Sequence, residues 1–477
     1  MRRPVTVVAM AVATVLALVV AGQSWSDPPF HPTFVGGRMP DPTGRPSGEP
    51  GLAVAGDGTI WVAAIHGAVP PPQPDPTAIA VQGTGVWRSR DNGKSFTWVG
   101  DPLQVTARPG VFLGGSDADI AAAPLPNATG NYSVYVTSLG PPGGVNLAVS
   151  QDGGETFAII PVGGLPVPPI DRPWIAADGA CGFYVAYHGG PSWCANRFDV
   201  CDRLATATSA LTSVEVAPGG ASGVEALVGK VAVDTGARSR FTGNAYVPME
   251  VCEFPLGPPG EEESGGCAVL PRIQVARTTD HGRTWQRVSV ATVGNRAAPI
   301  WPATVAVDPT GTVHTVWFDD IQVYLSSSAD GGATWSPARV ISSGSASSAY
   351  PTVAAPAAGR VDVAWFGADR PGNANDRSVM GPAGATSSAA WKVWLARSTD
   401  GGRSFRRAVI SDTVHFGELC THGGGCENPG RTRTLFDDFG LGATRDGRSV
   451  VAFTTDQPGG TLESDRIAWL TERPGTK

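Results

Sequence analysis

The stretch SADGGATW, residues 328–335, places a Ser, an Asp, two glycines and a Thr in front of a Trp. The same pattern, S/T-x-D-x-G-x-S/T-W/F, occurs at four other places: SRDNGKSF from Ser89, SQDGGETF from Ser150, TTDHGRTW from Thr278 and STDGGRSF from Ser398. Its aspartate can accept hydrogen bonds from nearby backbone N–H groups, and its glycine can adopt a positive φ. Because a motif present five times indicates a repeated turn rather than a catalytic loop, we interpret its aspartates as structural: Asp91, Asp152, Asp280, Asp330 and Asp400.

A second repeat runs in step with the first. Each copy has a polar or Pro-containing start, a short apolar strand, a polar turn and a β-branched or aromatic strand. The copies start at Glu49, Asp117, Asp171, Gly229, Trp301, Tyr350 and Asp437. With the two strands that flank each eight-residue motif, a copy predicts four antiparallel strands, which is one blade of a β-propeller. In the third copy TATSALTS, from Thr206, is a degenerate motif. The sequence therefore predicts an all-β, seven-bladed propeller, with six blades as the alternative.

The N-terminus indicates export. Residues 1–22 contain two arginines, an apolar run and then small residues, the pattern of a secretory signal peptide. We expect cleavage near Gly22 and a secreted or cell-surface protein, with an uncleaved membrane anchor as the alternative. Residues 23–477 would form a single propeller domain. The last copy ends with the strand RIAWL and lacks a fourth strand, which residues 29–37 could supply to close the ring.

Charge and cysteine content exclude several classes of function. The net charge of −7 is not offset by a basic stripe, so neither nucleic acid nor an anionic membrane surface is an expected partner; we expect a monomer. The absence of CxxC and HExxH motifs gives no support to a zinc or dithiol site. Seven cysteines suit an oxidising compartment. Pairing by proximity in the sequence predicts three disulfides and does not place Cys181: Cys194 with Cys201, Cys252 with Cys267 and Cys420 with Cys426.

Long connections mark the expected binding face. The turns between the first and second strands are short and should share a face with the eight-residue motifs, which leaves the long connections on the opposite face. Polar residues at the inner strand ends of that face are Glu49, Asp117, Asp119, Asp171, Arg172, Asp319, Asp320, Tyr350, Asp369, Asp437, Asp438 and Asp456. Each of them could simply cap a strand. A ring of carboxylates could also hold calcium, although the expected chemistry requires no cofactor.

The five motifs resemble the Asp box of the bacterial neuraminidase repeat, found in sialidases and in other propellers such as sortilin-type receptors and xyloglucanases. In those proteins the box lies on the turn between the third and fourth strands, on the face opposite the substrate site. The resemblance covers nearly all of the chain after the signal segment. It is specific for fold and weak for function.

Sialidases hold the substrate carboxylate with three arginines and use a Tyr nucleophile, activated by a Glu, with an Asp as acid/base. The resemblance implies Tyr350 as nucleophile, with Tyr187 second, and Asp117 or Asp119 as acid/base. It implies Arg38, within Arg38-Met39-Pro40, Arg172 and Arg433 as carboxylate grips.

Four more residues are candidates for the site. Glu49 is a further catalytic candidate, and Asp171, Asp437 and Asp438 are further substrate-binding candidates. No Glu is assigned to Tyr350 by a motif. We expect an exo-α-sialidase type of glycoside hydrolase acting on extracellular glycans, with a non-catalytic glycan- or protein-binding propeller as the alternative.

Overall fold

The computed structural model describes residues 30–67, 83–104, 113–140, 144–161, 170–189, 192–200, 214–218, 224–253, 269–294, 302–421, 435, 438–457 and 465–475. The expected signal segment and the degenerate motif from Thr206 lie outside these residues. Within them, no helix has both the length and the hydrophobicity needed to cross a membrane.

The described residues form seven antiparallel sheets, each built from strands that are neighbours in the chain, apart from the sheet that joins both ends. This confirms the seven-bladed propeller and excludes the six-bladed alternative. Blade 1 contains β2 (Ser47–Val54), β3 (Ile60–His66), β4 (Gly83–Ser89) and β5 (Thr97–Gly100). Blade 2 contains β6 (Ser116–Ala122), β7 (Val134–Gly140), β8 (Gly144–Ser150) and β9 (Ala158–Pro161). Blade 3 contains β10 (Ile170–Asp178), β11 (Gly182–Gly189), β12 (Ser192–Asp199) and β13 (Val214–Pro218).

Blades 4 to 6 follow the same order, with one extra short strand in blade 4. Blade 4 contains β14 (Val224–Val228), β15 (Ala232–Val233), β16 (Ala245–Glu253), β17 (Arg272–Thr278) and β18 (Gln286–Thr292). Blade 5 contains β19 (Thr304–Val307), β20 (Val313–Phe318), β21 (Val323–Ser328) and β22 (Arg339–Val340). Blade 6 contains β23 (Ser347–Ala357), β24 (Arg360–Ala368), β25 (Ala390–Ser398) and β26 (Arg406–Phe416). The short helix α2 (Arg377–Met380) lies between β24 and β25.

Blade 7 joins the two ends of the chain. It contains β27 (Gly440–Ala443), β28 (Ser449–Thr455), β29 (Arg466–Glu472) and, as its outermost strand, β1 (Phe34–Arg38). β1 pairs antiparallel with β29, with Phe34 opposite Glu472 and Arg38 opposite Ala468. The pairing supports closure of the ring by the N-terminal segment, because it covers an edge of β29 that would otherwise be open.

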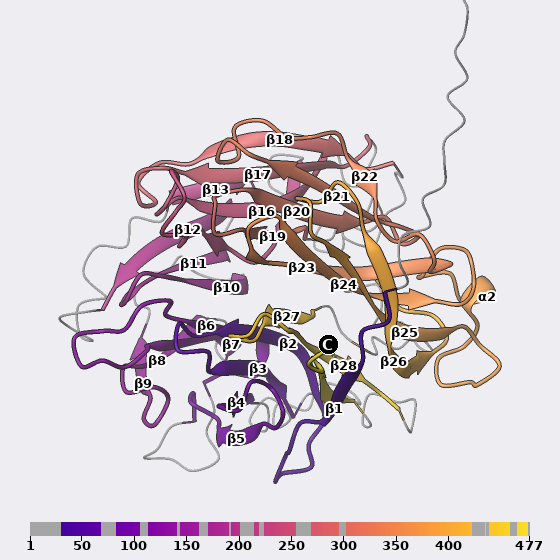
Figure 1. The fold of residues 1–477 in the computed structure, drawn as a ribbon, viewed down its shortest axis with the longest axis horizontal. Coiled ribbons are helices and arrows are strands. Elements are labelled where there is room, and N and C mark those ends of the chain that lie inside the picture. The colour runs from indigo at the N-terminus through magenta and orange to yellow at the C-terminus, as the bar shows by residue number, and fades with distance from the viewer. Residues whose placement is uncertain are drawn as a thin grey trace, which may run out of the picture.

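The core lies between adjacent blades rather than inside any one of them. The second strand of a blade is covered on both faces by its neighbours, and all seven residues of β3, IWVAAIH, are buried. One apolar cluster joins blades 1 and 2 through Trp61 and Val134, and another joins blades 2 and 3 through Tyr135 and Phe183. The first strands therefore lie around the centre of the ring and the fourth strands at its rim (Figure 1).

The five Asp boxes have the same internal hydrogen bonds. In the box from Ser328, the Asp330 carboxylate accepts hydrogen bonds from the backbone N–H of Thr334 (2.9 Å) and from its hydroxyl (2.6 Å). The Ser328 hydroxyl donates to Asp330 and accepts from the N–H of Gly332, which has a φ of 78°. These contacts hold the turn between the third and fourth strands.

Contacts between turns define the face on which the boxes lie. The N–H of Gly401, in the box of blade 6, donates to the carbonyl of Gly359 (2.7 Å), in the turn between the first and second strands of the same blade. In blade 1 the box carbonyl of Gly93 accepts the Thr471 hydroxyl of β29 (2.6 Å). The boxes thus share a face with the short turns, and they connect neighbouring blades. The inner strands surround a channel along the axis of the ring, and their starts lie at the end of this channel opposite the boxes.

Candidate functional site

The starts of four inner strands have the same irregular backbone. The ladder between the first and second strands shifts register between Gly48 and Gly51, Ser116 and Asp119, Asp171 and Trp174, and Ala349 and Thr352. Inside each bulge one non-glycine residue has a positive φ: Glu49 (56°), Asp117 (35°), Arg172 (49°) and Tyr350 (52°). Such strained residues concentrate at functional sites.

Proline explains part of this geometry. Pro50, Pro173 and Pro351 each follow a strained residue, and a proline cannot donate to the strand ladder, so the ladder is interrupted there. Neighbouring blades hold the interrupted segments in place. The Thr137 hydroxyl donates to the Pro173 carbonyl (2.6 Å), and the Thr304 hydroxyl donates to the Pro351 carbonyl (3.3 Å).

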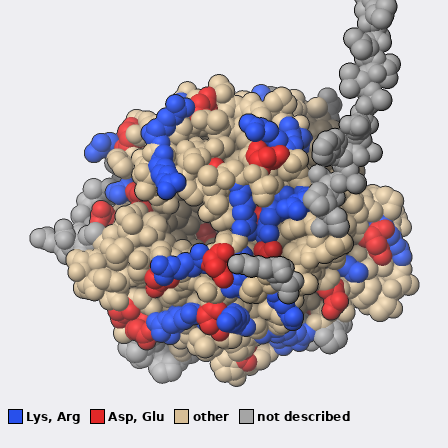
Figure 2. Space-filling view, in the orientation of Figure 1, with Lys and Arg blue, Asp and Glu red and all other residues tan. Residues whose placement is uncertain are grey.

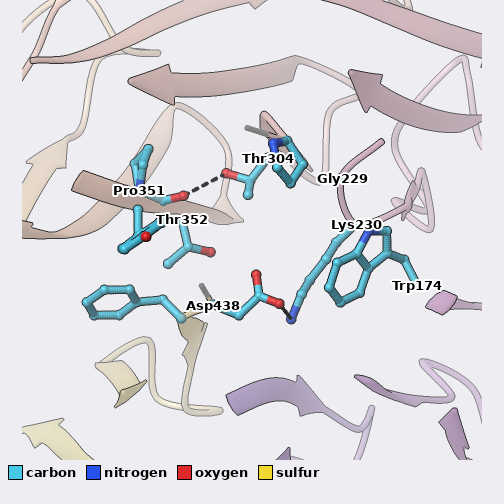
Figure 3. A pocket seen from close by; sticks show the side chains of 10 residues that line it. Trp174, Gly229, Lys230, Thr304, Pro351, Thr352 and Asp438 are labelled. Atoms are coloured by element: carbon cyan, nitrogen blue, oxygen red, sulfur yellow. Dashed lines mark hydrogen bonds and ion pairs between the residues drawn. The ribbon is translucent and has the colours of Figure 1, made fainter. Parts of the chain in front are cut away.

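The strand starts of several blades meet in one pocket on the axis, which we call the axial pocket (Figure 3). It is enclosed and narrow, with a volume of about 10 Å³, which is room for about one water molecule. Blades 3 to 7 contribute its lining: Trp174, Gly229, Lys230, Pro302, Thr304, Tyr350, Pro351, Thr352, Asp438 and Phe439.

Lys230 is the centre of an ion cluster at this pocket. Its ammonium lies 3.3 Å from Asp119 Oδ1 of blade 2 and 3.8 Å from Asp438 Oδ2, just before β27 of blade 7. The same ammonium lies 5.1 Å from the centre of the Trp174 ring. One side chain from blade 4 therefore links three other blades across the channel.

Burial and charge determine the protonation of this cluster. Burial raises the pKa of Asp119, although Lys230 and the Ile175 N–H, which donates to Asp119 Oδ2 (3.0 Å), oppose that rise. Burial alone would lower the pKa of Lys230, but the carboxylates of Asp119, Asp438 and Glu49 outweigh it and raise the pKa. Lys230 therefore stays charged at neutral pH, and Asp119 holds a proton more readily than an ordinary aspartate.

The structure brings several sequence candidates together at this end of the channel. Glu49 and Arg172 are buried and Asp117 is partly exposed, and all three lie in the bulges next to Asp119 and the pocket. Tyr350 lines the pocket, and its hydroxyl donates to the Cys420 carbonyl (3.1 Å).

Other candidates do not lie there. Arg38 lies on the outermost strand of blade 7, exposed, and its guanidinium donates to the Gln457 carbonyl. The hydroxyl of Tyr187 is bound within blade 3, where it accepts from Asn196 (3.3 Å). Arg433 and Asp437 lie outside the described residues, and the Asp171 side chain is also outside the description.

Lys230 and Trp174 are pocket residues that the sequence reasoning missed. Both occupy starts of second-repeat copies, in GKVAV and DRPWI. Their position in the repeat could have identified them, because the start of every copy lies at the same end of the channel. Only arginines, carboxylates and tyrosines were expected in the site, so Lys230 and Trp174 were not predicted.

The opposite end of the channel forms a separate hollow of about 900 Å³. It is lined by the last residues of the inner strands and the short turns after them, including Val54, Ala357, Ala443 and Arg445. Figure 2 shows acidic and basic side chains distributed around a central hollow of the molecule. The charged side chains that line this hollow mostly bind other residues of the protein. Asp308, for example, accepts hydrogen bonds from Thr310, Thr312 and Gly359.

The cysteines require one correction. Cys181 is in a disulfide, whereas Cys194, which proximity had paired with Cys201, is a buried thiol within β12. The chain after β12 returns to the turn that carries Cys181, where the N–H of Val200 donates to the Cys181 carbonyl (3.2 Å), so closeness in space differs from closeness in sequence. Cys252 and Cys420 are also disulfide-bonded; Cys201, Cys267 and Cys426 lie outside the described residues. Among the described residues no group of three or more His, Cys, Asp or Glu side chains is arranged to hold a metal.

Fold and site together define a seven-bladed β-propeller with a charged pocket at one end of its channel. No protein family matches the sequence, and no curated protein is significantly similar to it. Among solved structures, it is similar to a protein of unknown function from Dyadobacter fermentans (13% identity, 93% of this chain and 100% of that one, TM-score 0.46). It is also similar to the Hadza microbial sialidase Hz136 (13%, 90% and 66%, 0.42) and to the α-L-arabinofuranosidase Arb93A from Fusarium graminearum (11%, 93% and 98%, 0.47). These similarities are distant and concern the fold.

Proposed function

We propose that the protein is a secreted glycoside hydrolase that acts on extracellular glycans at the end of the channel where the axial pocket lies. The observation that carries the proposal is the pair of carboxylates held by one ammonium. Asp119 and Asp438 lie 3.3 and 3.8 Å from Lys230, so their nearest oxygens are no more than about 7 Å apart. Two carboxyl groups at roughly 5 to 9 Å are the usual machinery of glycosidic bond cleavage.

The two groups would have different roles. Asp119, whose pKa is raised by burial, donates its proton to the leaving oxygen as the glycosidic C–O bond breaks. Asp438 lines the pocket and acts on the other side of the sugar, either by taking a proton from the attacking water or by bonding to the anomeric carbon until water replaces it. Water supplies the hydroxyl group of the product in both cases.

The exo-α-sialidase activity expected from the sequence is one form of this proposal. It would use Tyr350, which lines the pocket, as nucleophile and Arg172, in a neighbouring bulge, as a carboxylate grip. Sialidase activity would first require the Tyr350 hydroxyl to rotate away from the Cys420 carbonyl, because the hydroxyl donates a hydrogen bond to that carbonyl.

Release of a fluorogenic leaving group from a panel of glycosides, sialosides included, tests the proposal. Asp119→Asn and Asp438→Asn should each lower kcat/KM by roughly 10²- to 10⁴-fold. Asp330→Asn is the matched control, since it removes the same charge from an Asp box on the opposite face and should leave turnover unchanged. The proposal fails if the unsubstituted protein hydrolyses no glycoside, or if both pocket variants keep full activity.

A second candidate, a non-catalytic glycan-binding propeller, is favoured by the position of Lys230, whose ammonium lies 3.3 Å from Asp119 and 3.8 Å from Asp438 and compensates the charge of both proposed catalytic groups. Calorimetry separates the two candidates. Heat of glycan binding without release of reducing sugar would favour the binding protein, and steady production of reducing sugar would favour the hydrolase.

A further inference from the structure

The axial pocket is too small for a sugar but large enough for a water molecule. Its volume is about 10 Å³, and a cavity of roughly 10 to 15 Å³ holds one water. A sugar ring therefore has to bind outside the pocket, nearer the mouth of the channel. The pocket lies close to the channel surface, because the Lys230 and Asp438 side chains that line it remain 20% and 14% exposed.

The lining of the pocket offers polar partners to a water molecule. Asp438 Oδ2 is buried, and no described residue forms a hydrogen bond with it. Lys230 Nζ has three N–H donors and lies 3.8 Å from Asp438 Oδ2, too far for a direct hydrogen bond (Figure 3). A water between these atoms accepts from the ammonium and donates to the carboxylate. The Thr304 and Thr352 hydroxyls, also in the lining, can accept its second O–H.

The size of the pocket limits how Asp438 can act on a sugar. A carboxylate that bonds to the anomeric carbon has to contact the sugar ring directly, whereas one that acts through water needs room for that water between itself and the ring. Asp438 Oδ2 points toward Lys230 within the lining of a space that admits a water and no ring. The geometry therefore favours action through water.

We propose that the axial pocket holds the attacking water and that hydrolysis inverts the configuration of the anomeric carbon. This inference rests on the proposed function. Lys230 orients the water, and Asp438 Oδ2 takes one of its protons as the water oxygen bonds to the anomeric carbon. The bond from that carbon to the leaving oxygen breaks, and Asp119 gives its proton to the leaving oxygen. Exchange with solvent then returns a proton to Asp119 and removes the proton from Asp438.

The configuration of the first product tests the inference. Proton NMR during hydrolysis of the 4-methylumbelliferyl glycoside that is turned over fastest should show the anomer opposite to that of the substrate. No methyl glycoside should form in added methanol, because no covalent intermediate exists to react with it. Retention of configuration, or transfer to methanol, overturns the inference, leaves the hydrolase standing and favours Tyr350 or a direct bond to Asp438. If no glycoside is hydrolysed, the hydrolase and this role of Asp438 fail together.

A high-resolution crystal structure tests the water site without turnover. It should show an ordered water within about 3.2 Å of both Asp438 Oδ2 and Lys230 Nζ. Asp438→Asn keeps the size of the side chain, so it should keep the water but lower kcat by at least about 10²-fold. Asp330→Asn, on the other face, is the control and should change neither. A pocket without this water, or full kcat in an Asp438→Asn protein that circular dichroism shows to be folded, contradicts the inference.

Discussion

At the scale of the residue, backbone conformation decides which side chains reach the axis. Glu49, Arg172 and Tyr350 each have a φ near 50° within a bulge and are followed by proline. A positive φ is unfavourable for residues with a side chain, so the surrounding blade must compensate for it. Because the same bulge recurs, the repeat presents different side chains at the same end of the channel.

Asp320 offers a prediction at this scale. It follows β20, is fully buried and has a φ of 67°. Burial raises its pKa to about 7, although the side chains of Thr421 and Asn373 oppose the rise. The folded protein therefore retains this proton while the unfolded chain releases it near pH 4, so stability should decrease as pH rises from about 4 to 7.

Asp320→Asn should remove that decrease. Each pKa unit corresponds to about 1.4 kcal/mol, so the gain above pH 7 could reach roughly 4 kcal/mol and should vanish below pH 4. Thermal midpoints from pH 4 to 8 provide the measurement. If the difference between the two proteins does not change with pH, the carboxyl of Asp320 is not protonated in the folded state.

At the scale of the element, the Asp box is a turn stabilised by its own side chains and attached to the next blade. The Asp330 pKa is lowered to about 2, first by the Thr334 hydroxyl and then by its backbone N–H. The ionised carboxylate therefore contributes stability above about pH 4, and this contribution is lost as pH falls through 2.

Asp330→Ala should destabilise the protein by about 1 to 2 kcal/mol at pH 7, since two turn N–H groups and two hydroxyls lose their acceptor. The difference from the unsubstituted protein should shrink toward pH 2. Urea unfolding at both pH values measures it. Lys94→Ala, a substitution on the exposed part of the blade 1 box, is the control and should change little. A cost that is the same at pH 2 and pH 7 would contradict the assigned role.

The closing strand β1 can be tested with a single glycine. A Cβ atom at Gly36 would lie 1.8 Å from the Trp469 carbonyl oxygen, whereas at Gly37 it would lie 3.4 Å from the Trp469 ring. Gly36→Ala should therefore displace β1 from β29, lower the thermal midpoint by several degrees and promote association through the exposed edge. Gly37→Ala is the matched control. Light scattering measures association, and thermal melts measure the midpoint. If the two variants have the same midpoint and the same association, the pairing of β1 with β29 has no structural role.

At the scale of the whole molecule, a buried ion network joins blades 6 and 7. The Asp362 carboxylate of β24 accepts hydrogen bonds from Arg397 (2.9 Å), Arg360 (2.6 Å) and Ser449 (2.5 Å). Arg397 also forms two bonds with Glu472 of β29, at 2.9 and 2.7 Å. Non-consecutive parts of the chain are held together here, beside the blade that closes the ring.

Asp362→Ala should lower stability by roughly 3 to 5 kcal/mol, because it leaves two guanidinium groups without their shared partner in a buried site. Chemical unfolding monitored by tryptophan fluorescence measures the free energy of unfolding of each variant. Glu155→Ala removes an exposed partner of Arg88 and Arg90 and serves as the control, with no measurable effect expected. If both substitutions cost the same, the network contributes no more than a surface pair.

Most of the fold could be predicted from the sequence because each blade repeats the same local rules. Turn residues recur at fixed positions in the boxes, and apolar and β-branched runs recur between them, so the strand order within a blade and a ring of seven blades, with six as the alternative, follow from the repeats. Less of the site could be predicted. The starts of the copies identify Glu49, Asp119 and Tyr350, but not which of them lie close together.

The sequence by itself determined the repeated blade unit and the structural role of SADGGATW, since local hydrogen bonding and periodicity decide both. Only the tertiary structure decided that Lys230 of blade 4 meets Asp119 of blade 2 and Asp438 of blade 7, and that Cys181 rather than Cys194 is disulfide-bonded. The physical reason is the closure of the ring. It brings residues hundreds of positions apart onto one axis, and no spacing within a repeat encodes distances across that axis.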